Sequence, residues 1–64
     1  MTEWNIKQLA AALASDLQAC QTSHERLMVN AIGGREIREA AARFAALRKL
    51  TPGEVAIASQ YGYR

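Results

Sequence analysis

Apolar or half-apolar side chains recur at three- and four-residue intervals through the first half of the chain. The positions of this stripe are Ile6, Leu9, Leu13, Leu17, Cys20, His24, Leu27 and Ala31. Such spacing places them on one face of an α-helix, in a heptad-like pattern with one four-residue insertion. Asn5 suits the N-cap because Gln8, three residues later, completes a capping box; Thr2 is an alternative cap one turn earlier. The pattern predicts a helix over about 5–31, roughly 40 Å long.

One short stretch inside this predicted helix favours a break. Gln21, Thr22 and Ser23 are consecutive poor helix formers, and Thr22 with Glu25 has the spacing of a second capping box. A break there would divide the stripe into two helices. We expect one continuous helix, because the stripe keeps its phase across the stretch.

Glycine and proline mark the remaining boundaries. Gly33-Gly34 is expected to end the first helix, since glycine tolerates the left-handed conformation of a helix C-terminus. A second helix is predicted over about 35–49, and its buried face would carry Ile37, Ala40, Ala41, Phe44 and Leu47. Thr51, Pro52 and Glu54 form an N-cap, an N1 proline and a capping box, which predict a short third helix over about 52–60. Gly62 should end it.

These elements predict an all-α fold, a helical hairpin with a long first helix and a short third helix, in a single domain of residues 1–64. A first helix of about 27 residues would leave half of its stripe exposed beside a shorter second helix. A chain of this size also buries only about 60% of its unfolded surface, and its one cysteine allows no internal disulfide. We therefore expect a homodimer, with Ile6, Leu9, Leu13 and Leu17 at the interface.

Composition and charge indicate the helix content of the chain and its expected location in the cell. Alanine accounts for 13 of the 64 residues, which favours helix throughout. We expect no membrane span, because no apolar run reaches about 18 residues, and no signal peptide. A single cysteine suits the reducing cytoplasm, where we expect the protein to be located. Residues 1–33 carry two basic and three acidic side chains, whereas residues 34–64 carry six basic and three acidic ones.

We expect no enzymatic activity, no cofactor and no metal. Cys20 and His24, four residues apart, would share a face of a continuous helix, and cysteine–histidine pairs serve as nucleophiles in several hydrolases. Those enzymes take the two residues from separate elements and add an oxyanion hole, so we expect this pair to be buried and inert. One cysteine and one histidine also fall short of the four ligands of a typical zinc site.

Two groups of residues are candidates for contact with a protein partner. Arg35, Arg38 and Lys49 are expected on the exposed face of the second helix. The tail adds Tyr61, Tyr63 and Arg64, residue types that are enriched at binding hot spots. The alternative for the tyrosines is that they cover the end of the helical bundle, and the sequence leaves this choice open.

Nucleic-acid binding is the second functional alternative. The segment from Ile37 to Phe44, followed by a turn and by Thr51 to Val55, resembles the first half of a helix-turn-helix. The connection is longer than usual, and the predicted third helix contains neither arginine nor lysine to contact bases or phosphates. A small DNA-binding regulator that uses the basic second helix is therefore less favoured than a protein-binding module.

In its size, alanine-rich composition and hairpin plan, the chain resembles small accessory proteins encoded by temperate phages or plasmids. The resemblance covers the overall plan and no single motif. Some of these proteins bind and inhibit a host regulator, including anti-activators of quorum-sensing transcription factors. The resemblance implies a non-enzymatic interaction module that binds another protein, such as a host transcriptional regulator, and modulates its activity.

Overall fold

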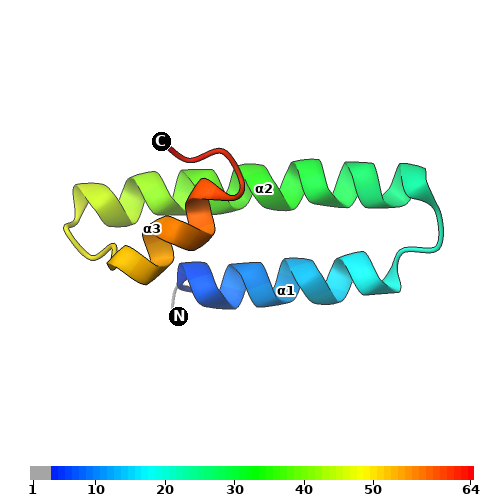
Figure 1. The fold of residues 1–64 in the computed structure, drawn as a ribbon, viewed down its shortest axis with the longest axis horizontal. Coiled ribbons are helices and arrows are strands. Elements are labelled where there is room, and N and C mark those ends of the chain that lie inside the picture. The colour runs from blue at the N-terminus through cyan, green and yellow to red at the C-terminus, as the bar shows by residue number, and fades with distance from the viewer. Residues whose placement is uncertain (1–3) are drawn as a thin grey trace.

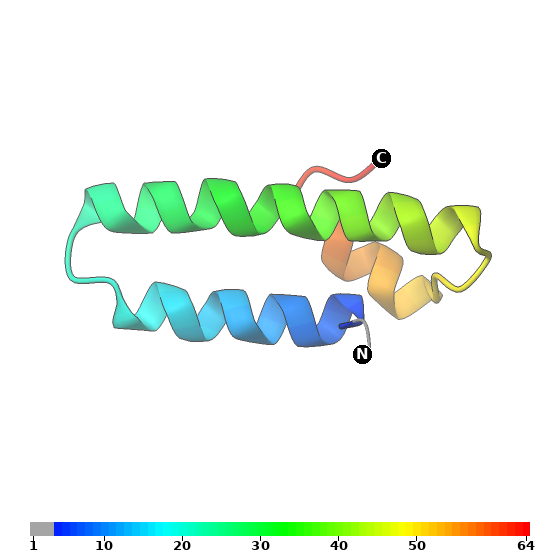
Figure 2. The same cartoon turned by 180° about the vertical axis from the view of Figure 1, so that it is seen from behind.

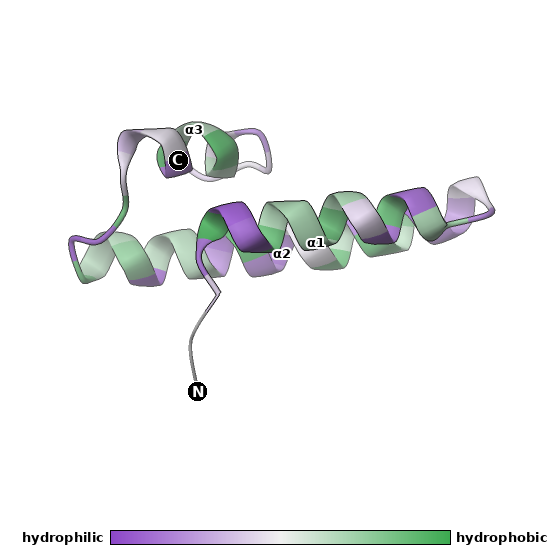
Figure 3. Cartoon of the chain, turned by 90° about the horizontal axis from the view of Figure 1, so that it is seen from below, coloured by the Kyte–Doolittle hydropathy of each residue, from purple (hydrophilic) through white to green (hydrophobic). Residues whose placement is uncertain are grey.

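Three helices and their connections make up residues 4–64, which a computed structural model describes (Figure 1). They are α1 (Ile6–Ala19), α2 (Ser23–Ala46) and α3 (Pro52–Ser59). α1 and α2 lie side by side and antiparallel, and α3 packs across one face of this pair (Figures 1 and 3). The predicted all-α class is confirmed for these residues. The alternative cap Thr2 lies outside them.

The predicted starts of α1 and α3 are confirmed at the level of hydrogen bonds. The Gln8 amide donates to Asn5 Oδ1 at 2.8 Å, and the Asn5 amide donates to Gln8 Oε1 at 2.9 Å, which completes the capping box. At α3 the Glu54 amide donates to Thr51 Oγ1 at 3.3 Å, and proline occupies the first turn. Both starts follow from side-chain oxygens that satisfy amides the helix itself leaves unpaired.

The prediction of a single long first helix is wrong. α1 ends at Ala19, Cys20 is extended, and α2 begins at Ser23 with Thr22 as its N-cap. The Glu25 amide donates to Thr22 Oγ1 at 3.1 Å, and this hydroxyl donates to Glu25 Oε1 at 3.3 Å. The local cap therefore prevails over the continuous apolar phase, because folding the chain back at this point lets α1 pack against α2 of the same chain.

The prediction that Gly33-Gly34 ends a helix is also wrong, and so is a second helix that begins at Arg35. Both glycines lie in the interior of α2. A Cβ atom on Gly33 would overlap Cδ1 of Leu13 in α1. Gly34 is buried beside Tyr61. Gly33 thus serves close packing against α1, whereas a Cβ atom on Gly34 would make only ordinary contacts, and a left-handed backbone is not required of either.

α2 ends at Ala46, three residues before the predicted boundary, in a Schellman motif. The Lys49 amide donates to the Phe44 carbonyl at 2.8 Å, and the Arg48 amide donates to the Ala45 carbonyl at 3.0 Å. This closure places Arg48 in the left-handed region, with φ of 57°. Because Leu47 lies in this turn, it points outward and is 60% exposed, which contradicts its predicted place on the buried face.

The core lies where α3 closes over the α1–α2 pair and consists mainly of small and branched side chains. Its buried members are Ile6, Leu13, Ile37, Ala40, Ala41 and Ala58. The alanines allow the three helix backbones to approach closely. α3 is further tied to α1 by Glu54, whose Oε2 accepts a long hydrogen bond of 3.4 Å from the Ile6 amide.

Candidate functional site

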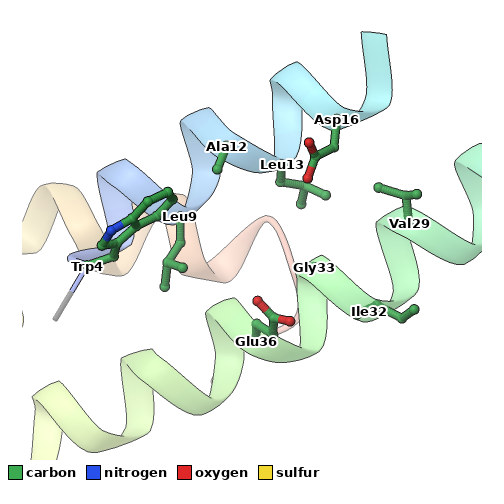
Figure 4. A pocket seen from close by; sticks show the side chains of 9 residues that line it. All are labelled: Trp4, Leu9, Ala12, Leu13, Asp16, Val29, Ile32, Gly33 and Glu36. Carbon is green, nitrogen blue, oxygen red and sulfur yellow. The ribbon is translucent and has the colours of Figure 1, made fainter. Parts of the chain in front are cut away.

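An apolar groove of about 520 Å³ runs between α1 and α2 (Figure 4). It lies on the face of the helix pair opposite α3, which is the face seen in Figure 2. The groove is lined by Trp4, Leu9, Ala12, Leu13, Asp16, Val29, Ile32, Gly33 and Glu36. Seven of these nine residues are apolar, and two are acidic. α1 and α2 each supply one acidic residue and several of the apolar ones.

Small residues at two points leave room for the groove. Gly33 has no side chain and seats Leu13, which is 4% exposed and forms part of the floor. On α1, Ala12 lines the groove with only a methyl group. A larger residue in place of Ala12 would fill this space, and one in place of Gly33 would displace Leu13, so the groove follows from the side-chain sizes that face it.

Large apolar side chains stay exposed around the groove. Trp4 is 53% exposed at the end where α1 begins, and Ile32 is 48% exposed on α2. Met28 is 50% exposed and lies one helical turn before Ile32, on the same side of α2. Exposed large apolar groups gathered beside a concave apolar surface are typical of sites that bind another molecule.

Two carboxylates point toward the space between the helices, Asp16 from α1 and Glu36 from α2 (Figure 4). Both residues are exposed. Carboxylates repel one another and are strongly hydrated, so they do not favour closure of the groove onto itself. They give a predominantly apolar surface a negative border.

The residues predicted at a dimer interface divide between the core and the groove. Ile6 and Leu13 are buried by α2 and α3 of the same chain and do not need a second copy to cover them. Leu9 and Leu17 are half-buried against the core, and Leu9 also lines the groove. The homodimer stays a prediction, now without the half-exposed 27-residue helix that motivated it.

The residues predicted to bind a partner are not gathered in the groove. Tyr61 and Tyr63 are half-buried against the core, in keeping with the alternative that they cover the end of the bundle. Arg38 Nη1 donates a hydrogen bond of 2.7 Å to the Tyr61 carbonyl, so part of its donor capacity is used within the chain. The remaining three predicted residues, Arg35, Lys49 and Arg64, are exposed.

The groove itself escaped the sequence reasoning because of the misplaced helix boundary. Once α2 is continuous through Gly33, Val29, Ile32 and Glu36 fall at positions i, i+3 and i+7, on one side of one helix. That spacing is visible in the sequence. Its pairing with Leu9, Ala12 and Asp16 is not, because it depends on the register between α1 and α2.

The cysteine–histidine pair is separated by the break between the first two helices. Cys20 is buried just after α1, and its Sγ donates to the Asp16 carbonyl at 3.2 Å. His24 lies exposed in the first turn of α2. Within residues 4–64 there is no cluster of three or more His, Cys, Asp or Glu side chains suited to a metal ion. Nor is any helix of this described part long and apolar enough to cross a bilayer.

Comparison with known proteins leaves the groove as the principal guide to function. No protein-family model matches the sequence, and no curated protein and no solved structure is significantly similar to it.

Proposed function

We propose that this chain is a small non-enzymatic binding module that holds another protein in the groove between α1 and α2 and thereby modulates it. The observation that carries the proposal is the groove, an apolar trough of about 520 Å³ bordered by exposed Trp4 and Ile32. Apolar surface of this kind is unfavourable in contact with water, and a partner's apolar side chains would displace that water. A host transcriptional regulator, the partner type implied by the resemblance, is one target within this proposal.

The DNA-binding alternative receives less support from the same residues. The Arg38 guanidinium is engaged with the Tyr61 carbonyl. The groove is bordered by carboxylates that would repel phosphates. Duplex DNA binding with a steep salt dependence, weakened by Arg38→Ala, is the result that would favour this alternative.

The proposal is tested by comparing Ile32→Glu with Leu47→Glu in affinity capture from a lysate of the producing cells. Both leucine-sized side chains are exposed, 48% and 60% respectively, so neither substitution empties the core. Only Ile32 lines the groove. We expect a protein retained by the wild type and by Leu47→Glu to be lost with Ile32→Glu, while circular dichroism shows the same helix content for all three. Equal retention by the two variants would contradict binding through the groove.

A further inference from the structure

The dimensions of the groove fit a helix laid lengthwise. Its walls are two antiparallel helices, lined on α1 from Leu9 to Asp16 and on α2 from Val29 to Glu36, and Trp4 lies just before α1. Seven helical steps on each wall correspond to about 10 Å, or two turns. A third helix that packs into a groove between two others presents apolar side chains at positions i, i+3, i+4 and i+7. The groove therefore has the length and the lining for about two turns of one amphipathic helix.

The two acidic residues of the groove lie on opposite walls and at different positions along its length. Leu13 of α1 faces Gly33 of α2. Asp16 lies three residues beyond Leu13, and Glu36 lies three residues beyond Gly33. Because the helices are antiparallel, these steps lead in opposite directions, about 4.5 Å each, so the backbone positions of the two residues are offset by about 9 Å along the groove. A docked helix would meet one negative charge along each margin.

From this arrangement we infer that the occupant of the groove is an amphipathic helix of another protein, with lysine or arginine at both margins of its apolar stripe. The inference rests on the proposed function. Lysine and arginine lay their aliphatic stems along apolar surface while the charged ends reach outward, which suits a groove with an apolar floor and acidic borders. The two carboxylates then gain partners at the periphery, where ion pairs contribute mainly to specificity.

The preference for a basic helix comes from the carboxylates at the groove and not from the net charge of the chain. The chain carries a formal charge of +2, so its overall field repels a basic ligand. None of the nine residues that line the groove is lysine or arginine, and at physiological salt the screening length is about 8 Å, so charges beyond that distance act weakly on a ligand held there. General attraction between opposite net charges thus does not account for binding of a basic helix.

A second copy of this chain matches the groove less well. A twofold contact brings the same patch of each copy together. It would therefore bring the Asp16 and Glu36 pair of one copy close to the same pair of the other. Such like-charge contacts oppose association.

The test uses three synthetic peptides of about 18 residues that share leucine at heptad positions a and d and differ only at e and g, which are lysine, glutamine or glutamate. The peptides contain no aromatic residue. Trp4, the only tryptophan of the chain and half-exposed at the groove, then reports binding by its fluorescence. We expect saturable binding of the lysine peptide at least about tenfold tighter than that of the glutamate peptide. Glutamine should lie between them.

Glu36→Gln and Glu39→Gln provide a matched pair of variants. Both residues are exposed on α2 and lose the same charge, but only Glu36 lines the groove. We expect Glu36→Gln to weaken binding of the lysine peptide about three- to fivefold, and Glu39→Gln by less than about twofold. Equal effects of the two variants, or no saturable binding of the lysine peptide, would overturn the inference.

Two further outcomes separate this inference from the proposed function. If all three peptides bind equally well and Ile32→Glu abolishes their binding, the groove is a docking site and the basic character of its occupant is refuted. If sedimentation of the protein alone shows a dimer that Ile32→Glu dissociates, the occupant is a second copy, and the inference is likewise overturned.

Discussion

Leu13 of α1 rests directly on Gly33 of α2, so closely that a Cβ atom on Gly33 would overlap Leu13 Cδ1 and lie 3.1 Å from its Cγ. This contact brings the two helices together and forms the floor of the groove. It depends on a glycine in the middle of a helix, where glycine is otherwise unfavourable by about 1 kcal/mol relative to alanine.

Gly33→Ala and Gly34→Ala should therefore have opposite effects on stability. At Gly33 the new methyl group meets the buried Leu13, and overpacking of this kind costs about 1–3 kcal/mol, which exceeds the gain in helix propensity. At Gly34 the nearest atom is Arg38 Nη1 at 3.5 Å, an ordinary contact, so up to about 1 kcal/mol should be gained. Thermal unfolding of the two variants checks this, and an equal change in both would refute the close contact.

Arg48→Gly should stabilise the end of α2. Arg48 has φ of 57° in the Schellman turn, whereas the equivalent turn after α3 uses Gly62, with φ of 96°. A residue with a Cβ atom pays about 1 kcal/mol for this conformation, and glycine does not. We expect the free energy of unfolding to rise by about 0.5–1 kcal/mol in denaturant titrations. Arg48→Ala removes the same charge but keeps the Cβ atom, so no comparable gain is expected from it.

Thr22→Ala should weaken the start of α2. The Thr22 hydroxyl accepts from the Glu25 amide at 3.1 Å, and loss of a threonine N-cap costs about 1 kcal/mol. For a chain of this length that corresponds to a decrease in Tm of roughly 4–8 °C. Ser23→Ala, one residue further and exposed within the helix, is the control and should change Tm little. Equal melting of both variants would argue against the cap as the reason for the break.

Arg38→Ala should loosen the C-terminal turn. Its guanidinium donates to the Tyr61 carbonyl at 2.7 Å, and its stem lies against Gly62. Because the bond is exposed, we expect a loss of about 1 kcal/mol together with faster amide hydrogen exchange at Tyr63. Arg35→Ala, an exposed residue on the same helix, removes the same charge. A similar loss in that control would mean that net charge rather than the contact is responsible.

The starts of the helices could be read from the sequence because they are local. Asn5, Thr22 and Thr51 each bond to an amide three residues away, and this geometry is encoded within four consecutive residues. Thr22 with Glu25 carried the correct signal for the break. The uninterrupted phase of the stripe suggested continuity, but only its first part is packed: Ile6 and Leu13 lie in the core, whereas Leu27 is 67% exposed.

The groove, by contrast, required the fold. Gly33 in isolation indicates a helix end, and only the antiparallel register that places Leu13 opposite it reveals a packing role. The same register aligns Asp16 and Glu36 on the two walls.

The predicted partner of the first helix shows most clearly which features depend on the sequence alone and which depend on the tertiary structure. The sequence by itself determined the helical class, the helix starts at Asn5 and Thr51 and the need of an apolar stripe for a partner helix, since all of these depend on short-range hydrogen bonds and periodicity. Tertiary structure decided that the partner of the first part of the stripe is α2 of the same chain, because three residues of turn after Ala19 let α2 fold back over Ile6 and Leu13. The later stripe position Leu27 stays 67% exposed. Tertiary structure also decided where apolar surface is left uncovered, since this depends on the sizes of side chains that meet across the two helices.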